Sequence, residues 1–149
     1  MIQRIQSVFL FVSLCFLVPL FFAPMAVLVH ETGEIFSFNF VGFYRSELGI
    51  TTREYSILAF GILICALNLI IIFMYRNRLL QIRLCIYNIL LLIGISGVVL
   101  FVLYGVRDIH AISFRLPAVF PVVSVILHYL AFRGIRKDEL MVQALSRLR

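Results

Sequence analysis

The sequence predicts an all-α membrane protein with four transmembrane helices, both termini cytoplasmic, on the strength of three observations. Hydrophobic residues make up 63% of the 149 residues and charged residues 13%, whereas soluble domains average about 45–50% and 25%. Four apolar runs approach or exceed the length needed to cross about 30 Å of hydrocarbon. Basic residues collect in segments that would share one side of the membrane. A soluble domain and a disordered chain are both excluded, and residues 1–149 are expected to form one domain.

The four predicted spans are about 7–29, 55–75, 84–106 and 116–132. We expect the first to be a retained anchor, because its apolar stretch exceeds the roughly 7–15 residues of a signal peptide. The fourth is short, and the Arg residues that flank it are expected to snorkel to the interface. Barrel strands are disfavoured because the runs do not alternate polar and apolar residues. Thr51 and Glu54 fit a capping box that would start the second span.

The distribution of charge orients the spans. Lys and Arg favour the cytoplasmic side of short loops, and nine of the 13 lie in residues 1–6, 76–83 and 133–149. Of the seven acidic residues, five lie in the two other connections. The net charge of +6 therefore describes a dipolar membrane protein with both termini inside. A nucleic-acid partner is not expected, because no soluble fold carries a basic face.

Two segments outside the spans have patterns of their own. Residues 35–41 alternate in the manner of a short strand, which predicts a β-like or irregular outer loop between the first and second helices. Aromatic anchoring at the membrane interface is the alternative. After the fourth span, Met141, Leu145 and Leu148 share a helical face beside basic residues. This pattern predicts an amphipathic C-terminal helix on the cytoplasmic side.

Small and polar residues mark the faces on which the helices are expected to pack, because helices in lipid associate through close approach and hydrogen bonds. Pro121 is expected to bend the fourth helix. For Asn68 an interhelical hydrogen bond is favoured over a ligand site, and for His128 packing is favoured over a proton relay. The predicted stripe comprises Gly61, Asn68, Gly94, Gly97, Pro121, Ser124 and His128.

No catalytic residues, cofactor or metal are expected. The sequence has no phosphate-binding loop, no paired carboxylates and no zincin motif, and nucleophilic catalysis would need a Cys or Ser beside a base. The three cysteines lie within or at the end of spans and are expected to be free thiols. One outer cluster has zinc-type ligands, although its spacing matches no standard signature. Its members are His30, Glu31, Glu34, Asp108 and His110.

The basic segments indicate how the protein would work. They are expected to contact anionic lipid headgroups, a larger membrane complex or a second copy of the chain. The expected function is a non-enzymatic structural or accessory subunit. A transport component that uses the polar stripe, and an outer-face metal or ligand site, are the alternatives. The expected contact residues are Arg4, Arg78, Gln81, Arg83, Arg136, Lys137, Asp138, Arg147 and Arg149.

Three separated motifs resemble a known family. They are residues 1–7 (MIQRIQS), residues 77–85 (NRLLQIRLC), and residues 135–140 (IRKDEL) followed by Arg-Leu-Arg at the end. Together they are similar to four-span membrane proteins of Bacteroidota described only as a domain of unknown function. Ser146 departs from the acidic residue that the family often has before the final Arg-Leu-Arg. The resemblance implies four spans in a bacterial inner membrane and supplies no activity.

Overall fold

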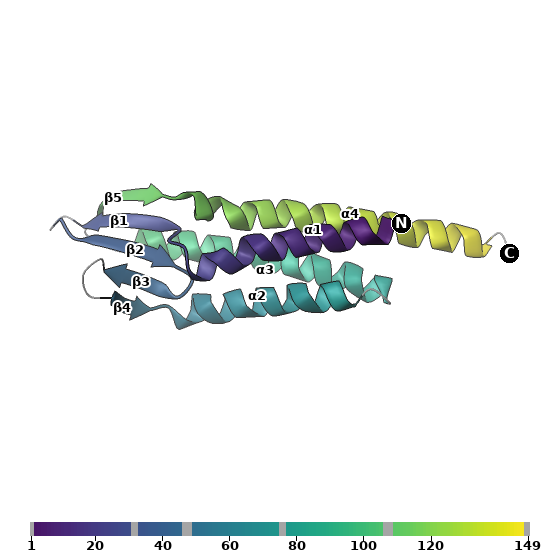
Figure 1. The fold of residues 1–149 in the computed structure, drawn as a ribbon, viewed down its shortest axis with the longest axis horizontal. Helices are drawn as coiled ribbons and strands as arrows, with labels where there is room; N and C mark the ends of the chain where they lie inside the picture. Colours follow the sequence, from purple (N-terminus) through teal and green to yellow (C-terminus); the bar gives the residue numbers. More distant parts are fainter. Residues whose placement is uncertain (1, 31–32, 46–48, 75–76, 106–108, 148–149) are drawn as a thin grey trace.

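The computed structural model describes residues 2–30, 33–45, 49–74, 77–105 and 109–147. The described chain is mostly helical, and a five-stranded sheet lies at one end of the helices (Figure 1). In order, the elements are α1 (Ile2–Leu17), the 3-10 helix η1 (Val18–Phe21), β1 (Ala26–His30), β2 (Ile35–Asn39), β3 (Gly42–Arg45), β4 (Gly49–Arg53), α2 (Tyr55–Phe73), α3 (Arg78–Gly105), β5 (Ile109–Phe114), the 3-10 helix η2 (Leu116–Val119) and α4 (Phe120–Arg147).

Three helical segments are long and apolar enough to cross a membrane, namely Tyr55–Phe73, Leu79–Gly105 and Leu116–Ala144. A fourth apolar helical segment, Ser7–Phe21, is shorter. Large apolar side chains face outward along these helices, and Phe73 and Phe101 are 76% and 79% exposed. Apolar patches this extensive are unfavourable in water, so the outer surface of the helices suits lipid.

The first predicted span, 7–29, is not a single helix. The α-helix ends at Leu17, and η1 follows with a proline in its first turn. Residue 22 ends this turn, and the chain then leaves as strand β1 after Pro24. Proline removes a backbone donor and disfavours helix in the residue before it. The final residues of the apolar run therefore belong to the sheet.

The other helix boundaries differ less. α3 begins at Arg78, before the predicted start at residue 84, so part of the basic connection is helical. α4 continues without a break to Arg147, so the predicted C-terminal helix is an extension of α4 that projects beyond the other helices (Figure 1). The capping-box prediction is wrong, because Thr51 lies in β4 and Glu54 makes no side-chain capping bond.

The sheet confirms a β-structured segment between the first and second helices and extends it. Its strands are antiparallel, in the order β4-β3-β2-β1-β5. Strand β5 follows α3 in the chain and pairs with β1, with Ala26 opposite Phe114. This pairing joins the α1–α2 connection to the α3–α4 connection, so both lie at the same end of the helices (Figure 1).

The turn between β2 and β3 attaches the sheet to the helices. Asn39 Oδ1 accepts hydrogen bonds from the backbone N–H groups of Val41 and Gly42 at 2.9 and 3.1 Å. Gly42 has φ +146°, a conformation that favours glycine. The Asn39 amide donates to the carbonyl of Phe21 at 3.3 Å, and the Phe40 N–H donates to the carbonyl of Leu20 at 3.1 Å. The turn is therefore fixed to η1.

The Phe40 ring fills the space between the turn and α2. It packs edge-on against Phe21, with ring centroids 5.6 Å apart. A Cβ added to Gly61 would lie 2.9 Å from the Phe40 ring and 3.0 Å from the Phe21 ring. A larger residue at this position of α2 would therefore force one of the two rings to move.

The helices pack in a closed order. α1 and α3 each contact both α2 and α4. On every helix the buried positions recur at spacings of three and four residues, as expected for helices packed side by side. These positions are Leu10, Ser13, Leu17 and Leu20 on α1 and η1; Ile57, Gly61, Ile64, Asn68 and Ile71 on α2; Gln81, Cys85, Asn88, Leu92, Ile95, Val99 and Leu103 on α3; and Pro121, Ser124, His128, Ala131 and Ile135 on α4.

Candidate functional site: a buried polar layer

The buried apolar core is divided into two clusters along the helices. The cluster next to the sheet contains the buried apolar residues Leu17, Leu20, Met25, Ala26, Leu28, Phe38, Phe40, Ile57, Ile64, Leu92, Ile95, Val99 and Leu103. The cluster toward the opposite end contains Leu10, Ile71, Cys85, Ala131 and Ile135. All four helices contribute at least one residue to the smaller cluster, so the division runs across the whole bundle of helices.

On every helix, buried polar residues lie between the part that packs in one cluster and the part that packs in the other. Asn68 is the buried residue between Ile64 and Ile71, and Asn88 is the one between Cys85 and Leu92. The buried polar residue at this depth is Ser13 on α1, and on α4 the buried polar residues are Ser124 and His128. The five residues have no solvent-exposed surface, and we call them the polar layer. They are Ser13, Asn68, Asn88, Ser124 and His128.

His128 is the centre of the hydrogen bonds in the polar layer. Its Nδ1 lies 2.9 Å from the Ser124 carbonyl oxygen and 3.0 Å from Ser13 Oγ. A carbonyl only accepts, so Nδ1 carries the proton and donates. Nε2 lies 2.8 Å from Asn88 Nδ2 and accepts from that amide. The imidazole is therefore held as one neutral tautomer by contacts to α1, α3 and its own helix.

Several other atoms of the polar layer have no hydrogen-bond partner among the described residues. They are both amide atoms of Asn68, Oδ1 of Asn88 and Oγ of Ser124. Leaving a buried polar group unpaired costs about 1–3 kcal/mol, and hydrocarbon offers no substitute partner. The layer therefore has capacity to bond a small polar guest such as water.

The chemistry available in the polar layer is limited to neutral donors and acceptors. Its members are one imidazole, two amides and two hydroxyls, which supply no carboxylate and no cationic head. The Ser13 hydroxyl contacts the imidazole at Nδ1, which carries the proton and so cannot accept one from Ser13. A nucleophile needs a base that can take its proton, so the pair in this tautomer is arranged for packing and polar binding.

The predicted stripe is brought together in part. Gly61, Asn68, Pro121, Ser124 and His128 lie on buried faces. Gly94 and Gly97 lie on the exposed face of α3, and nothing lies within 4 Å of a Cβ added to either. The reason is that α3 packs through larger residues, which include Leu92 and Ile95. Each of these precedes a glycine by two residues and so lies on nearly the opposite face of the helix.

Ser13 and Asn88 belong to the site and were absent from the sequence prediction. Asn88 has a detectable signal, because it continues a series with Cys85 and Leu92 at spacings of three and four. Ser13 lies within a nearly uniform apolar run. Only its contact with His128, 115 residues away in the chain, distinguishes it from the other small residues of α1.

The predicted outer cluster is assembled only in part within the described residues. His30 lies at the end of β1 opposite Ile109, the neighbour of His110. Glu34 forms an ion pair with Arg45 across the sheet. Among the described residues no three His, Cys, Asp or Glu side chains are grouped to hold a metal ion. Glu31 and Asp108 lie outside the described residues.

The residues predicted to make cytoplasmic contacts have different environments. Gln81 is buried, and its amide donates to the Ile71 carbonyl at 3.2 Å, satisfying a carbonyl near the end of α2. It therefore stabilises the α2–α3 connection and is not a surface contact. Arg83, Arg136 and Lys137 are exposed, and Asp138 is half-buried. Arg4, Arg78 and Arg147 lie in helices where the side chains are outside the description, as is Arg149 entirely.

Fold and site together define a class: a small helical protein with helices of membrane-spanning length, a sheet at one end and a polar layer in its core. The chain belongs to the family described as "Domain of unknown function (DUF4293)", whose family model matches residues 2–148. This match confirms the part of the motif-based resemblance that predicted a domain of unknown function, and the family description assigns no activity. No curated protein matches the chain.

Proposed function

We propose that the protein is a non-enzymatic accessory subunit of the bacterial inner membrane. Its four helices form a four-helix bundle that spans the bilayer, and both termini are cytoplasmic. The end opposite the sheet would contact anionic lipid headgroups through Arg83, Arg133, Arg136 and Lys137, which we call the basic end. The observation that carries the proposal is that these four side chains are all exposed and lie where the apolar stretches finish.

The shorter first helix is the fourth span in this proposal. Ser7–Phe21 is apolar and measures about 25 Å as α- and 3-10 helix, close to the hydrocarbon thickness of about 30 Å. α1 packs against both α2 and α4. Its outward residues Val8 and Phe11 are exposed and apolar. These properties match those of the three longer helices.

The depth of the basic residues supports contact with headgroups. Arg133 follows the apolar part of α4, and Arg136 and Lys137 lie about 5 Å further along the axis. That is within the Debye length of about 8–10 Å, over which a membrane surface attracts cations. Arg147 lies about 20 Å beyond Arg133, and α4 continues straight in Figure 1. Residues 133–137 are therefore better placed to meet lipid than the end of the helix.

The test measures which lipids stay with the purified protein. A variant with Arg133→Gln, Arg136→Gln and Lys137→Gln is compared with the unaltered chain in nanodiscs of mixed phosphatidylglycerol and phosphatidylcholine. Each basic residue near a membrane surface contributes about 1 kcal/mol, so the preference for phosphatidylglycerol should fall about 100-fold. Arg45→Gln is the matched control, because Arg45 is a cation of the sheet that is paired with Glu34. An unchanged preference in the triple variant contradicts the proposal.

A second candidate function, a transport component, is favoured by one observation: the unpartnered atoms of the polar layer. A pathway requires that water reach the layer, whereas its residues are fully buried between two apolar clusters. The test introduces Ser124→Cys and measures its modification by a small water-soluble thiol reagent. Modification at the rate of an exposed cysteine supports transport. Protection until the protein unfolds supports the accessory subunit.

A further inference from the structure

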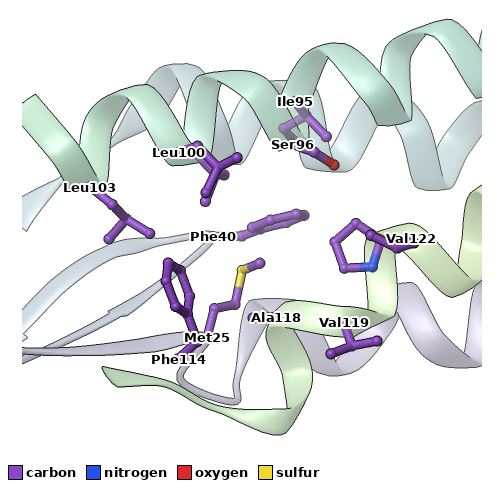
Figure 2. A pocket seen from close by; sticks show the side chains of 12 residues that line it. Met25, Phe40, Ile95, Ser96, Leu100, Leu103, Phe114, Ala118, Val119 and Val122 are labelled. Atoms are coloured by element: carbon purple, nitrogen blue, oxygen red, sulfur yellow. The ribbon is translucent and has the colours of Figure 1, made fainter. Parts of the chain in front are cut away.

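A cavity of about 380 Å³ lies where α3, η2 and the start of α4 meet the sheet. Figure 2 shows Leu100 and Leu103 of α3 on one side and Val119 and Val122 on the other. The Phe40 ring lies between the two sides in the same view. The cavity is therefore bounded by two candidate spans and by the part of the sheet that packs on them.

The lining of this cavity is almost entirely apolar. Among the described lining residues the one polar member is Ser96, whose hydroxyl donates to the Leu92 carbonyl of its own helix at 2.7 Å. The serine hydroxyl proton is therefore already used, and none of these described residues is charged. Sites that bind small molecules through apolar contact have this character and enclose about 300–1,000 Å³. A ligand of this cavity must therefore be apolar in the part that contacts the lining.

The mouth of the cavity faces the lipid side of the helices. Val119 and Val122 line the cavity and are also 55% and 57% exposed, and Leu100 on the facing helix is exposed too. These residues belong to helical segments long and apolar enough to cross a membrane. A molecule can therefore enter sideways from the bilayer without crossing water.

A cationic residue adjoins the cavity lining in the chain. Arg115 directly follows the lining residue Phe114 and has an exposed side chain. Its backbone N–H donates to the Met25 carbonyl at 2.8 Å, and its carbonyl accepts from the Ala118 N–H at 2.9 Å. Both partners line the cavity, so the backbone that carries the guanidinium is fixed at the cavity. Guanidinium groups recognise phosphate by charge-assisted hydrogen bonds.

We propose that this cavity binds one acyl chain of an anionic phospholipid from the leaflet on the sheet side, with the phosphate at Arg115. An apolar cavity of about 150 Å³ takes up a benzene-sized guest, so the space here suits a single chain. Charge complementarity at Arg115 selects the headgroup. The proposal rests on α3 and α4 spanning the membrane and is independent of the basic end.

The test uses a phosphatidylglycerol probe with a diazirine in one acyl chain, incorporated into nanodiscs with the full chain. After illumination, peptide mass spectrometry locates the crosslinks. We expect them to concentrate in residues 95–103 and 114–122. Ala118→Phe fills the cavity and should abolish these crosslinks. Ala66→Phe is the matched control, because Ala66 is exposed on α2 and outside the cavity lining, and it should leave them unchanged.

A second measurement separates specific binding from general contact with lipid. Replacing Arg115→Gln should lower the preference for the phosphatidylglycerol probe over a phosphatidylcholine probe about fivefold, with the crosslinked positions unchanged. Protection of the buried Cys85 thiol reports that each variant is folded. Crosslinks spread evenly over the outward faces of all helices, or crosslinking by folded Ala118→Phe equal to that of the unaltered chain, overturns the proposal.

Discussion

The two ends of the molecule differ in whether their polar side chains have partners within the chain. At the sheet end, five strands pair their backbones, Asn39 bonds to the turn and to Phe21, and Glu34 pairs with Arg45. At the basic end, cationic side chains point outward from the ends of the helices. The difference teaches that Asn39, Glu34 and Arg45 at the sheet end find their polar partners within the chain. The basic end depends on what surrounds the protein, and in our proposal this is anionic lipid.

The largest expected effect tests the tight attachment of the sheet end to the helices. Gly61→Ala places a methyl group against the Phe40 and Phe21 rings, and overpacking of this kind costs about 1–3 kcal/mol. Gly97→Ala is the matched control, because an added Cβ there meets nothing within 4 Å. Thermal exposure of the Cys85 thiol in detergent measures both. Equal melting temperatures would show that the rings yield easily and that the sheet is loosely attached.

The next effect concerns the polar layer between the two ends. Asn88→Leu removes the donor to His128 Nε2 and should cost about 1 kcal/mol, the usual size of an interhelical hydrogen bond in membranes. Asn68→Leu removes an amide whose two atoms have no partner among the described residues, and it should leave stability unchanged or raise it. The same thiol assay compares them. A larger loss for Asn68→Leu would show that its amide binds a guest such as water.

The smallest expected effect lies at the surface of the sheet. Glu34→Gln removes the charge that pairs with Arg45, and both side chains are about one-third exposed. Exposed ion pairs contribute about 0–1 kcal/mol, so the melting temperature should move little and the difference should shrink further in high salt. A large, salt-independent loss would mean that the sheet depends on this pair more than on backbone pairing.

Much of the architecture follows from the sequence, because apolar run length decides which segments suit lipid. Runs 55–75 and 84–106 correspond to α2 and α3 with boundaries shifted by a few residues. The alternation at 35–41 corresponds to β2 and the following turn. The prediction of a single helix over residues 7–29 was wrong, because a buried strand and a buried helix are equally apolar. Pro19 and Pro24 were the available signals that the helix ends early.

The candidate site was less accessible to sequence reasoning than the fold. Periodicity placed Asn68, Ser124 and His128 on buried faces, because a helix repeats every 3.6 residues. It could not choose between the two faces of α3, where glycines lie on one side and larger apolar residues on the other. The pairing of β5 with β1 could not be predicted either, because hydrophobic periodicity within a segment does not indicate which distant strand it pairs with.

The proposed function depends most on the placement of the sheet and the basic end on opposite sides of the membrane. The direct test introduces Ile35→Cys or Lys137→Cys, both at exposed positions, into a Cys15→Ser background. A membrane-impermeant maleimide is applied to right-side-out and to inverted membrane vesicles. Ile35→Cys should be labelled only in the right-side-out vesicles and Lys137→Cys only in the inverted ones. Labelling of both positions from the same side would contradict the four-span arrangement.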